Sequence, residues 1–337
     1  MTVFVSIRMR VAVSALVLSA GAYAQWAGNS QNLAVGNKSG DQVQPKVVRT
    51  SDGGCYVSWF DNNAGGYDVY LQRLDPRGYE QWAHNGILIA NRNYSSTMDY
   101  GLAIDANDDA ILTYNDDRSG GSQIGANKIA PDGTLLWGPN GVLLTNTADF
   151  VAAPNVAVTS DGNYIIGWTQ NADVVLQKLS STGVPQWTPA VRLVSPSGSY
   201  FFSHLIGSDN GTAIVLWVHQ IGNMYSNRYL YTQKLSPTGS LLWGASPVIV
   251  YNGGSVQNGY FPRFVTDGAG GAIYGWYETS GVRNCYFQHV NFLGSEVYPH
   301  NGVAVSTLTG RIRLSPTVAY NPVSGEVFMF WTESNTN

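Results

Sequence analysis

One motif recurs along this chain with a period of about 55 residues, and it constrains the fold more than any other feature. A first series of aromatic residues is Trp26, Trp82, Trp137, Trp187, Trp243 and Tyr298. A second aromatic series is Trp59, Tyr114, Trp168, Trp217, Trp276 and Trp331. A series of side-chain amides is Gln72, Asn127, Gln177, Gln233 and Gln288. Three series with one period indicate a repeat architecture, in which each unit buries its apolar face against the next.

Each repeat divides into four strand-like pieces. In the first copy these are residues 45–50, 55–61, 67–74 and 80–90, which we name strands a, b, c and d. Turns rich in Asp, Pro and Gly join a to b and c to d, as tight hairpins require. Four antiparallel strands at this period match a β-propeller blade, whereas a β-solenoid, the alternative, has shorter coils.

The sequence therefore predicts an all-β fold, a β-propeller of about six four-stranded blades. The predicted repeats are residues 45–90, 100–145, 154–195, 204–250, 262–306, and 316–337 together with 25–36. Residues 25–29 (QWAGN) resemble residues 81–85 (QWAHN), so we expect an N-terminal strand d to close the ring in the last blade, which would hide exposed strand edges. Strand c of that blade is missing from the sequence. Either the protein is longer than this chain or its last blade is incomplete.

The N-terminus has the features of a secretory signal peptide. Arg8 and Arg10 precede an apolar run over residues 11–20, and Ala22-Tyr23-Ala24 supplies a small-residue cleavage site. The run is shorter than the roughly 20 residues that span a bilayer. We therefore predict a signal peptide over residues 1–24 and a propeller domain over 25–337. The protein is expected to be secreted or on the cell surface, with the periplasm as a further option, and without a membrane span.

Composition excludes several classes of function. Charged residues make up 12% of the chain, the net charge is -4 and the pI is near 5.7, so there is no basic footprint for nucleic acid. Cys55 and Cys285 lie on different strand types of distant repeats, which predicts buried free thiols. The five histidines do not cluster, and no zinc spacing, phosphate loop or nucleophile elbow is present. We predict no metal, no cofactor and no catalytic residue.

Two features of one face suggest a binding site. The connections from b to c and from d to a are long and varied, and such loops on a rigid scaffold commonly carry binding. In addition, two residues after each strand-b aromatic stands a polar residue at the end of the strand. We name these residues the strand-b ring: Asp61, Asp116, Gln170, His219, Glu278 and Glu333. The strand-b ring is the candidate binding site. The alternative is that these residues are simply polar strand ends in contact with solvent.

The repeat resembles that of secreted bacterial β-propeller proteins. The resemblance lies in residues 72–82 (QRLDPRGYEQW) and their echo at 233–243 (QKLSPTGSLLW). The repeats of those proteins typically carry a V-x-K-L-x-x-x-G-x-x-x-W stretch. The element is also distantly similar to the tryptophan docking motif of quinoprotein dehydrogenases. That resemblance implies a packing role between blades for Trp82, Trp137, Trp187, Trp243 and Tyr298, without the quinone.

These observations favour a non-catalytic module. The first hypothesis is an exported binding or scaffold propeller that presents its long-loop face to a glycan or protein partner. It allows for further domains in a longer chain. The alternative is a carbohydrate-active enzyme, a glycoside hydrolase or lyase, that uses the acidic members of the strand-b ring. Paired carboxylates about 5–10 Å apart would be needed for hydrolysis.

Overall fold

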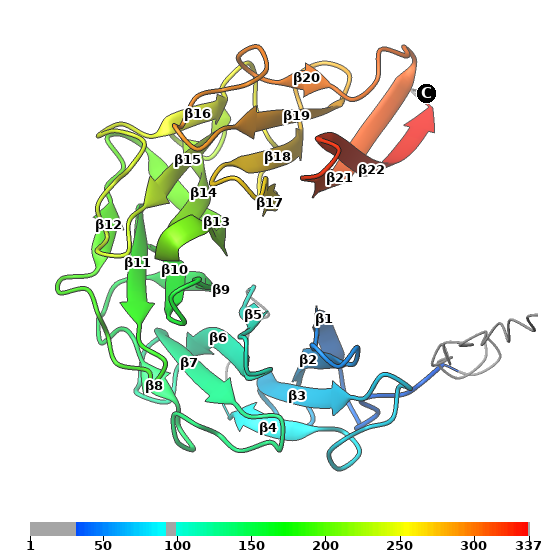
Figure 1. Cartoon of the computed structure of the whole chain (residues 1–337), viewed down its shortest axis with the longest axis vertical. Helices are drawn as coiled ribbons and strands as arrows, with labels where there is room; N and C mark the ends of the chain where they lie inside the picture. The colour runs from blue at the N-terminus through cyan, green and yellow to red at the C-terminus, as the bar shows by residue number, and fades with distance from the viewer. Residues whose placement is uncertain (1–31, 92–98, 336–337) are drawn as a thin grey trace, which may run out of the picture.

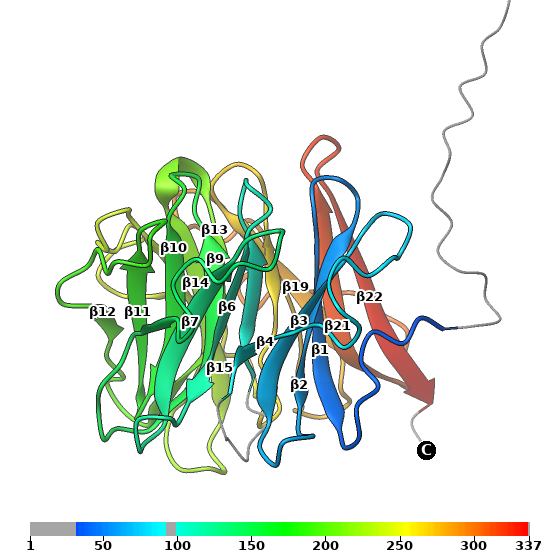
Figure 2. The same ribbon diagram turned by 90° about the horizontal axis from the view of Figure 1, so that it is seen from below.

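The computed structural model describes residues 32–91 and 99–335. The predicted signal peptide and residues 25–31 of the predicted closing strand lie outside this range. The described chain is all-β apart from one 3-10 turn at Asp209–Gly211. Its six antiparallel sheets are arranged as an arc around a central axis, and their strands run roughly along that axis (Figures 1 and 2).

Five of the sheets are four-stranded blades with strands in chain order. Blade 1 has β1 (Gln42–Arg49), β2 (Cys55–Asp61), β3 (Asp68–Leu74) and β4 (Ile87–Ala90). Blade 2 has β5 (Gly101–Ile104), β6 (Ala110–Asp116), β7 (Gln123–Ile129) and β8 (Val142–Leu143). Blade 3 has β9 (Val151–Val158), β10 (Tyr164–Gln170), β11 (Asp173–Leu179) and β12 (Val191–Leu193). Blade 4 has β13 (Ser199–Gly207), β14 (Ala213–Gln220), β15 (Arg228–Leu235) and β16 (Val248–Tyr251). Blade 5 has β17 (Phe264–Thr266), β18 (Ala272–Tyr277), β19 (Cys285–Val290) and β20 (Val303–Ala304).

The sixth sheet has two strands, β21 (Arg311–Asn321) and β22 (Glu326–Asn335). The predicted propeller architecture is confirmed, and the described residues of this last blade form strands a and b. The predicted closure is not formed by hydrogen bonds in the described residues, because residues 32–36 are not part of the β21–β22 sheet. The arc stays open between β22 and blade 1 (Figure 1).

Inside each complete blade, the amide of strand c fixes the beginning of strand d. In blade 4, Gln233 Nε2 donates to the Gly244 carbonyl (2.9 Å), and its Oε1 accepts from the Trp243 amide (3.0 Å). Gln72, Gln177 and Gln288 make the same pair of contacts to their own strands d. All four amides are buried, so these bonds satisfy groups that would otherwise be costly to bury.

The basic residue that follows this amide in strand c forms an ion pair with an Asp of the a–b turn in the same blade. Lys178 is buried and contacts Asp161 at 2.6 Å, and Lys234 contacts Asp209 at 2.5 Å. Burial opposes ionisation of Asp161, but hydrogen bonds from Lys178, Thr159 and Asn163 outweigh it and lower the pKa of this carboxyl to about 2. The a–b turns are thus held as structural hairpins.

Neighbouring blades are joined by the tryptophans that begin strand d. The Trp187 indole donates to the Pro237 carbonyl of blade 4 (3.0 Å), and Trp243 donates to the Phe292 carbonyl of blade 5 (3.0 Å). Each indole lies against the c–d turn glycine of the next blade. Four apolar cores fill the interfaces between blades 1 to 5.

Residues 32–41 lie against blade 1 in the place where a preceding blade would end. The Asn37 amide donates to Asn85 Oδ1 (2.8 Å), and Asn37 Oδ1 bonds His84 Nε2 (2.9 Å). Asn252, which follows strand d of blade 4, makes the same two bonds to Asn301 (2.7 Å) and His300 (2.8 Å) of blade 5. Residues just before Asn37 therefore occupy a strand-d position relative to blade 1.

No helix in the described residues is long and apolar enough to cross a membrane. Cys55 and Cys285 are buried and free.

Candidate functional site

The structure places each member of the strand-b ring within two residues of the end of its own strand, where local partners hold it. Asp116 is paired with Arg118, and Gln170 Nε2 donates to Asp149 (2.7 Å). Glu278 accepts the hydroxyls of Tyr251 and Tyr286, both at 2.6 Å.

The other three members are held in the same way. Asp61 accepts from the Asn63 amide (2.9 Å) and His219 Nε2 bonds the Ser197 carbonyl (2.8 Å). Glu333 pairs with Arg313 at 2.8 Å. No cluster of three or more His, Cys, Asp or Glu residues suited to a metal occurs in the described part of the chain. Binding by the strand-b ring stays a prediction.

A different set of residues converges at the centre of the arc. Strand a of several blades carries a β-bulge, visible as a register shift between Val43 and Lys46, between Phe202 and His204, and between Leu314 and Thr317. A bulge bends its strand and re-aims the side chain that follows. We name the residues that follow this bend the inner-wall positions: Lys46, Gly101, Asn155, His204, Arg263 and Thr317.

The inner-wall positions are equivalent in register. Lys46 pairs with Ser58, Asn155 with Gly167 and His204 with Leu216, and each partner directly precedes its strand-b aromatic. Gly101 holds this place in blade 2, opposite Thr113. Arg263 comes one residue before Phe264, which pairs with Tyr274. One residue from each blade is thereby set at the same height on the inner wall.

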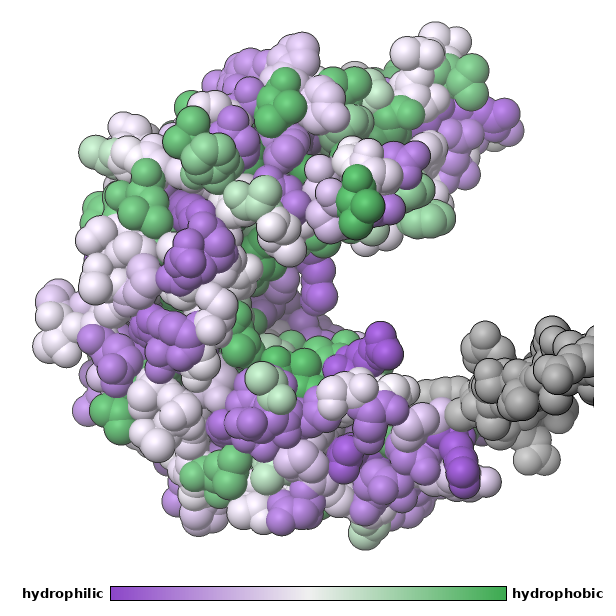
Figure 3. Space-filling view, in the orientation of Figure 1, coloured by the Kyte–Doolittle hydropathy of each residue, from purple (hydrophilic) through white to green (hydrophobic). Residues whose placement is uncertain are grey.

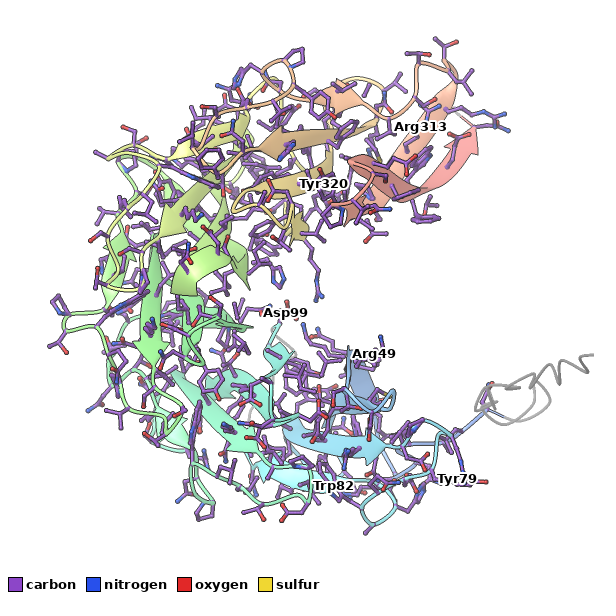
Figure 4. The ribbon with its side chains drawn as sticks, in the orientation of Figure 1. Arg49, Tyr79, Trp82, Asp99, Arg313 and Tyr320 are labelled. Atoms are coloured by element: carbon purple, nitrogen blue, oxygen red, sulfur yellow. The ribbon has the colours of Figure 1, made fainter. Side chains whose placement is uncertain are left out.

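Four of these side chains line a central cavity of about 520 Å³, which is bounded by β1, β5, β9, β13 and Arg263. Figure 3 shows the hollow in the middle of the arc, and Figure 4 labels Asp99 beside it. The lining residues of β1, β5, β9 and β13 lie in the later part of each strand, up to or near its last residue. The cavity therefore extends from the bend in strand a toward the face that carries the short a–b turns.

Two cations, Lys46 and Arg263, line this space, and one carboxylate pairs with the first of them. Lys46 Nζ contacts Asp99 at 2.6 Å and lies 4.8 Å from the ring centre of Tyr100. Burial lowers the pKa of Lys46; the Asp99 carboxylate opposes that change, and the charge of Arg263 adds to it. Arg263 is exposed and makes no hydrogen bond or ion pair with the described residues. The described residues of the cavity lining therefore include two cations and no carboxylate, and Asp99 offsets one of the two charges.

His204 adds an imidazole that lacks a partner. Its Nδ1 is buried without a hydrogen bond among the described residues, and its ring lies edge-on to Phe264 at 6.0 Å. Burial, reinforced by the charges of Arg263 and Lys46, lowers the pKa of His204 to about 3. The ring is neutral at ordinary pH and can both donate and accept a hydrogen bond.

The inner-wall positions were not among the residues predicted from sequence, although a signal for them exists. A proline precedes four of the six: Pro45, Pro154, Pro262 and Pro316. Proline within a sheet is confined to edges and bulges, so a recurring Pro-x in strand a marks the bend. The residue types that follow differ in every blade, and a search for a repeated residue type does not find them.

Comparison with known proteins does not identify a family for this chain. No protein-family model matches the chain, and no curated protein is significantly similar to it in sequence.

Several solved structures are similar to this chain at a low level. An α-L-arabinofuranosidase from Clostridium thermocellum has 15% identity and a TM-score of 0.42, over 77% of this chain and 91% of that one. A protein from Lactobacillus plantarum has 13% identity and a TM-score of 0.47, over 86% and 84%. The polysaccharide lyase Uly1 has 11% identity and a TM-score of 0.49, over 96% and 84%. Likeness at this level concerns the fold alone.

Proposed function

We propose that this chain is an exported, non-catalytic binding propeller whose central cavity holds an acidic glycan. The observation that carries the proposal is the convergence of Lys46, Asn155, His204 and Arg263 from four blades onto one cavity whose described lining has no carboxylate. A rigid β-scaffold with varied residues at one repeated position is a typical arrangement for a binding site.

The charge of the cavity favours an anionic ligand. Arg263 is an exposed guanidinium without a carboxylate partner in the described residues, and guanidinium binds carboxylate and sulfate through paired hydrogen bonds. Asn155 and the neutral His204 supply hydrogen-bonding groups for hydroxyls. A sugar acid or a sulfated sugar offers both kinds of group in one molecule.

The strand-b ring gives no comparable support for hydrolysis. Both Glu278 oxygens accept tyrosine hydroxyls, and the Glu333 and Asp116 carboxylates are paired with arginines. A general acid or nucleophile must be free to reach the glycosidic bond.

The test is a glycan array with carboxylated, sulfated and neutral oligosaccharides, probed with the parent, Arg263→Ala, and Arg77→Ala as control. Arg77 is exposed on the c–d turn of blade 1, so the control removes the same charge elsewhere. We expect Arg263→Ala to lose about tenfold in affinity for acidic glycans, equivalent to about 1.4 kcal/mol, and Arg77→Ala to lose none. Equal affinities of the parent and Arg263→Ala, or binding confined to neutral glycans, would contradict the proposal.

A further inference from the structure

Blade 3 differs from the other complete blades where strand d begins. In blade 4, strand d starts five residues after the tryptophan, at Val248 after Trp243, and blades 1, 2 and 5 have the same spacing. In blade 3 the spacing is four residues, from Trp187 to Val191. Both valines pair with the residue directly before the strand-c amide of their own blade, so the register of strand d is unchanged. Blade 3 therefore lacks one residue between its tryptophan and its strand d.

The missing residue shifts the contact that the strand-c amide makes. In blade 4, Gln233 Nε2 donates to the carbonyl of Gly244, the residue after the tryptophan (2.9 Å). In blade 3, Gln177 Nε2 donates to the carbonyl of Trp187 itself (3.0 Å). The next two residues, Thr188 and Pro189, lie beyond this contact, and both are exposed.

A pocket of about 450 Å³ lies beside these residues, between strand d of blade 3 and the c–d turn of blade 4. Its volume is in the range of small-molecule sites, about 300–1,000 Å³. The pocket shares no lining residue with the central cavity. Trp187, Pro189 and Pro237 form an apolar part of its wall, and the polar part includes Asn163, Lys178, Gln186 and Thr188.

The polar wall offers both donors and acceptors to a ligand. The Thr188 hydroxyl makes no hydrogen bond with the described residues, and a hydroxyl can donate and accept. Gln186 donates through Nε2 to the Val184 carbonyl (2.9 Å), and its Oε1 has no donor among the described residues. These two side chains can therefore bond neighbouring hydroxyls of one ligand.

The pocket carries no unpaired charge. Lys178 is the one cation in its described lining, and its Nζ contacts the Asp161 carboxylate at 2.6 Å. The same Nζ donates to the Pro237 carbonyl (3.3 Å). This pocket therefore differs from the central cavity, where the Arg263 guanidinium has no carboxylate partner in the described residues.

We infer that this pocket is a second binding site and that it takes a neutral sugar. A sugar ring presents C–H groups on its faces and hydroxyls at its edge, so it needs an apolar wall beside a wall of donors and acceptors. Trp187 and Pro189 supply the first, and Gln186 and Thr188 supply the second. A neutral ligand leaves the Lys178–Asp161 pair undisturbed, whereas an anion would compete with Asp161 for the cation.

The experiment measures affinity for the neutral oligosaccharides of a glycan array in the parent and three variants. Thr188→Val removes the hydroxyl and keeps the shape of the side chain. Thr182→Val is the matched control, because Thr182 is exposed on the c–d turn of the same blade and does not line the pocket. The third variant inserts glycine between Thr188 and Pro189, which restores the five-residue spacing of the other blades. Thermal unfolding checks that each variant is folded.

We expect Thr188→Val to lose about fivefold in affinity for neutral glycans, the effect of one hydrogen bond. The glycine insertion should abolish that binding, and Thr182→Val should keep the parental affinity. A parent that binds no neutral glycan, or equal affinities of Thr188→Val and Thr182→Val, would overturn the inference.

Arg263→Ala separates this inference from the proposed function. It should keep the parental affinity for neutral glycans while it loses affinity for acidic ones. A fall in neutral-glycan affinity in Arg263→Ala would place neutral sugars in the central cavity and overturn the inference. Because acidic glycans report on the central cavity and neutral glycans on this pocket, either proposal can fail without the other.

Discussion

At the residue scale, the chemistry of this propeller is concentrated in a few side chains that differ from blade to blade. Lys46 and His204 hold equivalent places in blades 1 and 4, yet one is a cation paired with Asp99 and the other is a neutral ring with a buried, unpartnered Nδ1. An unpartnered buried polar atom lowers stability unless a ligand satisfies it. Such an atom inside a polar cavity is consistent with binding there.

His204 also makes stability depend on pH. Its pKa in the folded protein is about 3, below the value near 6.5 of a free imidazole. Between those values the unfolded chain binds more protons, so stability falls as pH decreases from 6.5 toward 3. We expect His204→Gln to flatten this decline by about 1–2 kcal/mol between pH 6.5 and pH 4.5.

The measurement is urea unfolding of the parent and His204→Gln at several pH values. Parallel curves for the parent and His204→Gln would show that His204 is not the group responsible.

At the element scale, the c–d turn of one blade packs against the tryptophan of the previous blade. Gly294 has a φ of +81°, and a Cβ there would lie 2.6 Å from the Trp243 ring. Gly244 has a φ of +97°, but a Cβ there would meet no atom within 4 Å. The two glycines share the left-handed backbone and differ in what surrounds them.

Alanine at these two glycines separates backbone strain from packing. Gly244→Ala should cost about 1–2 kcal/mol, the usual penalty for a left-handed alanine. Gly294→Ala should cost about 1–3 kcal/mol more, because the indole of Trp243 must move. Chemical denaturation of both variants measures the difference, and equal losses would mean that Trp243 is not packed as described.

Much at the element scale could be predicted from sequence, because hairpin turns and apolar alternation are local signals. Turns such as residues 75–78 (DPRG) and strands such as β2 were identifiable in this way. The inner-wall positions could not be identified in this way, because a bulge determines where they point and each blade has a different residue type there. The strand-b ring was predicted correctly to lie at strand ends, but sequence does not reveal the partners, such as Tyr251 and Tyr286, that already occupy Glu278.

At the scale of the whole molecule, the six sheets of the arc are packed to different extents by neighbouring blades. Blades 2 to 4 are packed on both sides by the interblade cores, whereas the β21–β22 sheet packs on blade 5 through contacts such as Met329 against Gly275. Arg313, fully buried at this end, bonds Glu333 and Asn284 and ties the sheet to blade 5; Figure 4 labels its position.

This inequality predicts a gradient of local stability. Amides of β21 and β22 should exchange with solvent about 10- to 100-fold faster than those of β14 and β15 in the native protein, because segments with few buried contacts open first. Hydrogen exchange followed by mass spectrometry measures both regions in one sample. Equal protection of the two regions would show that the open end of the arc is as cooperative as its middle.

The bulge in strand a has a consequence for how such a protein diversifies. The amide clamp, the turn carboxylate and the docking indole are copied from blade to blade, while the residue after the bulge is Lys, Gly, Asn, His, Arg or Thr. The residues that build the blade and the residue that varies therefore occupy separate positions of the repeat. A substitution at one of the four varied positions that line the cavity, Lys46, Asn155, His204 or Arg263, changes the chemistry of its wall while the framework of strands stays the same.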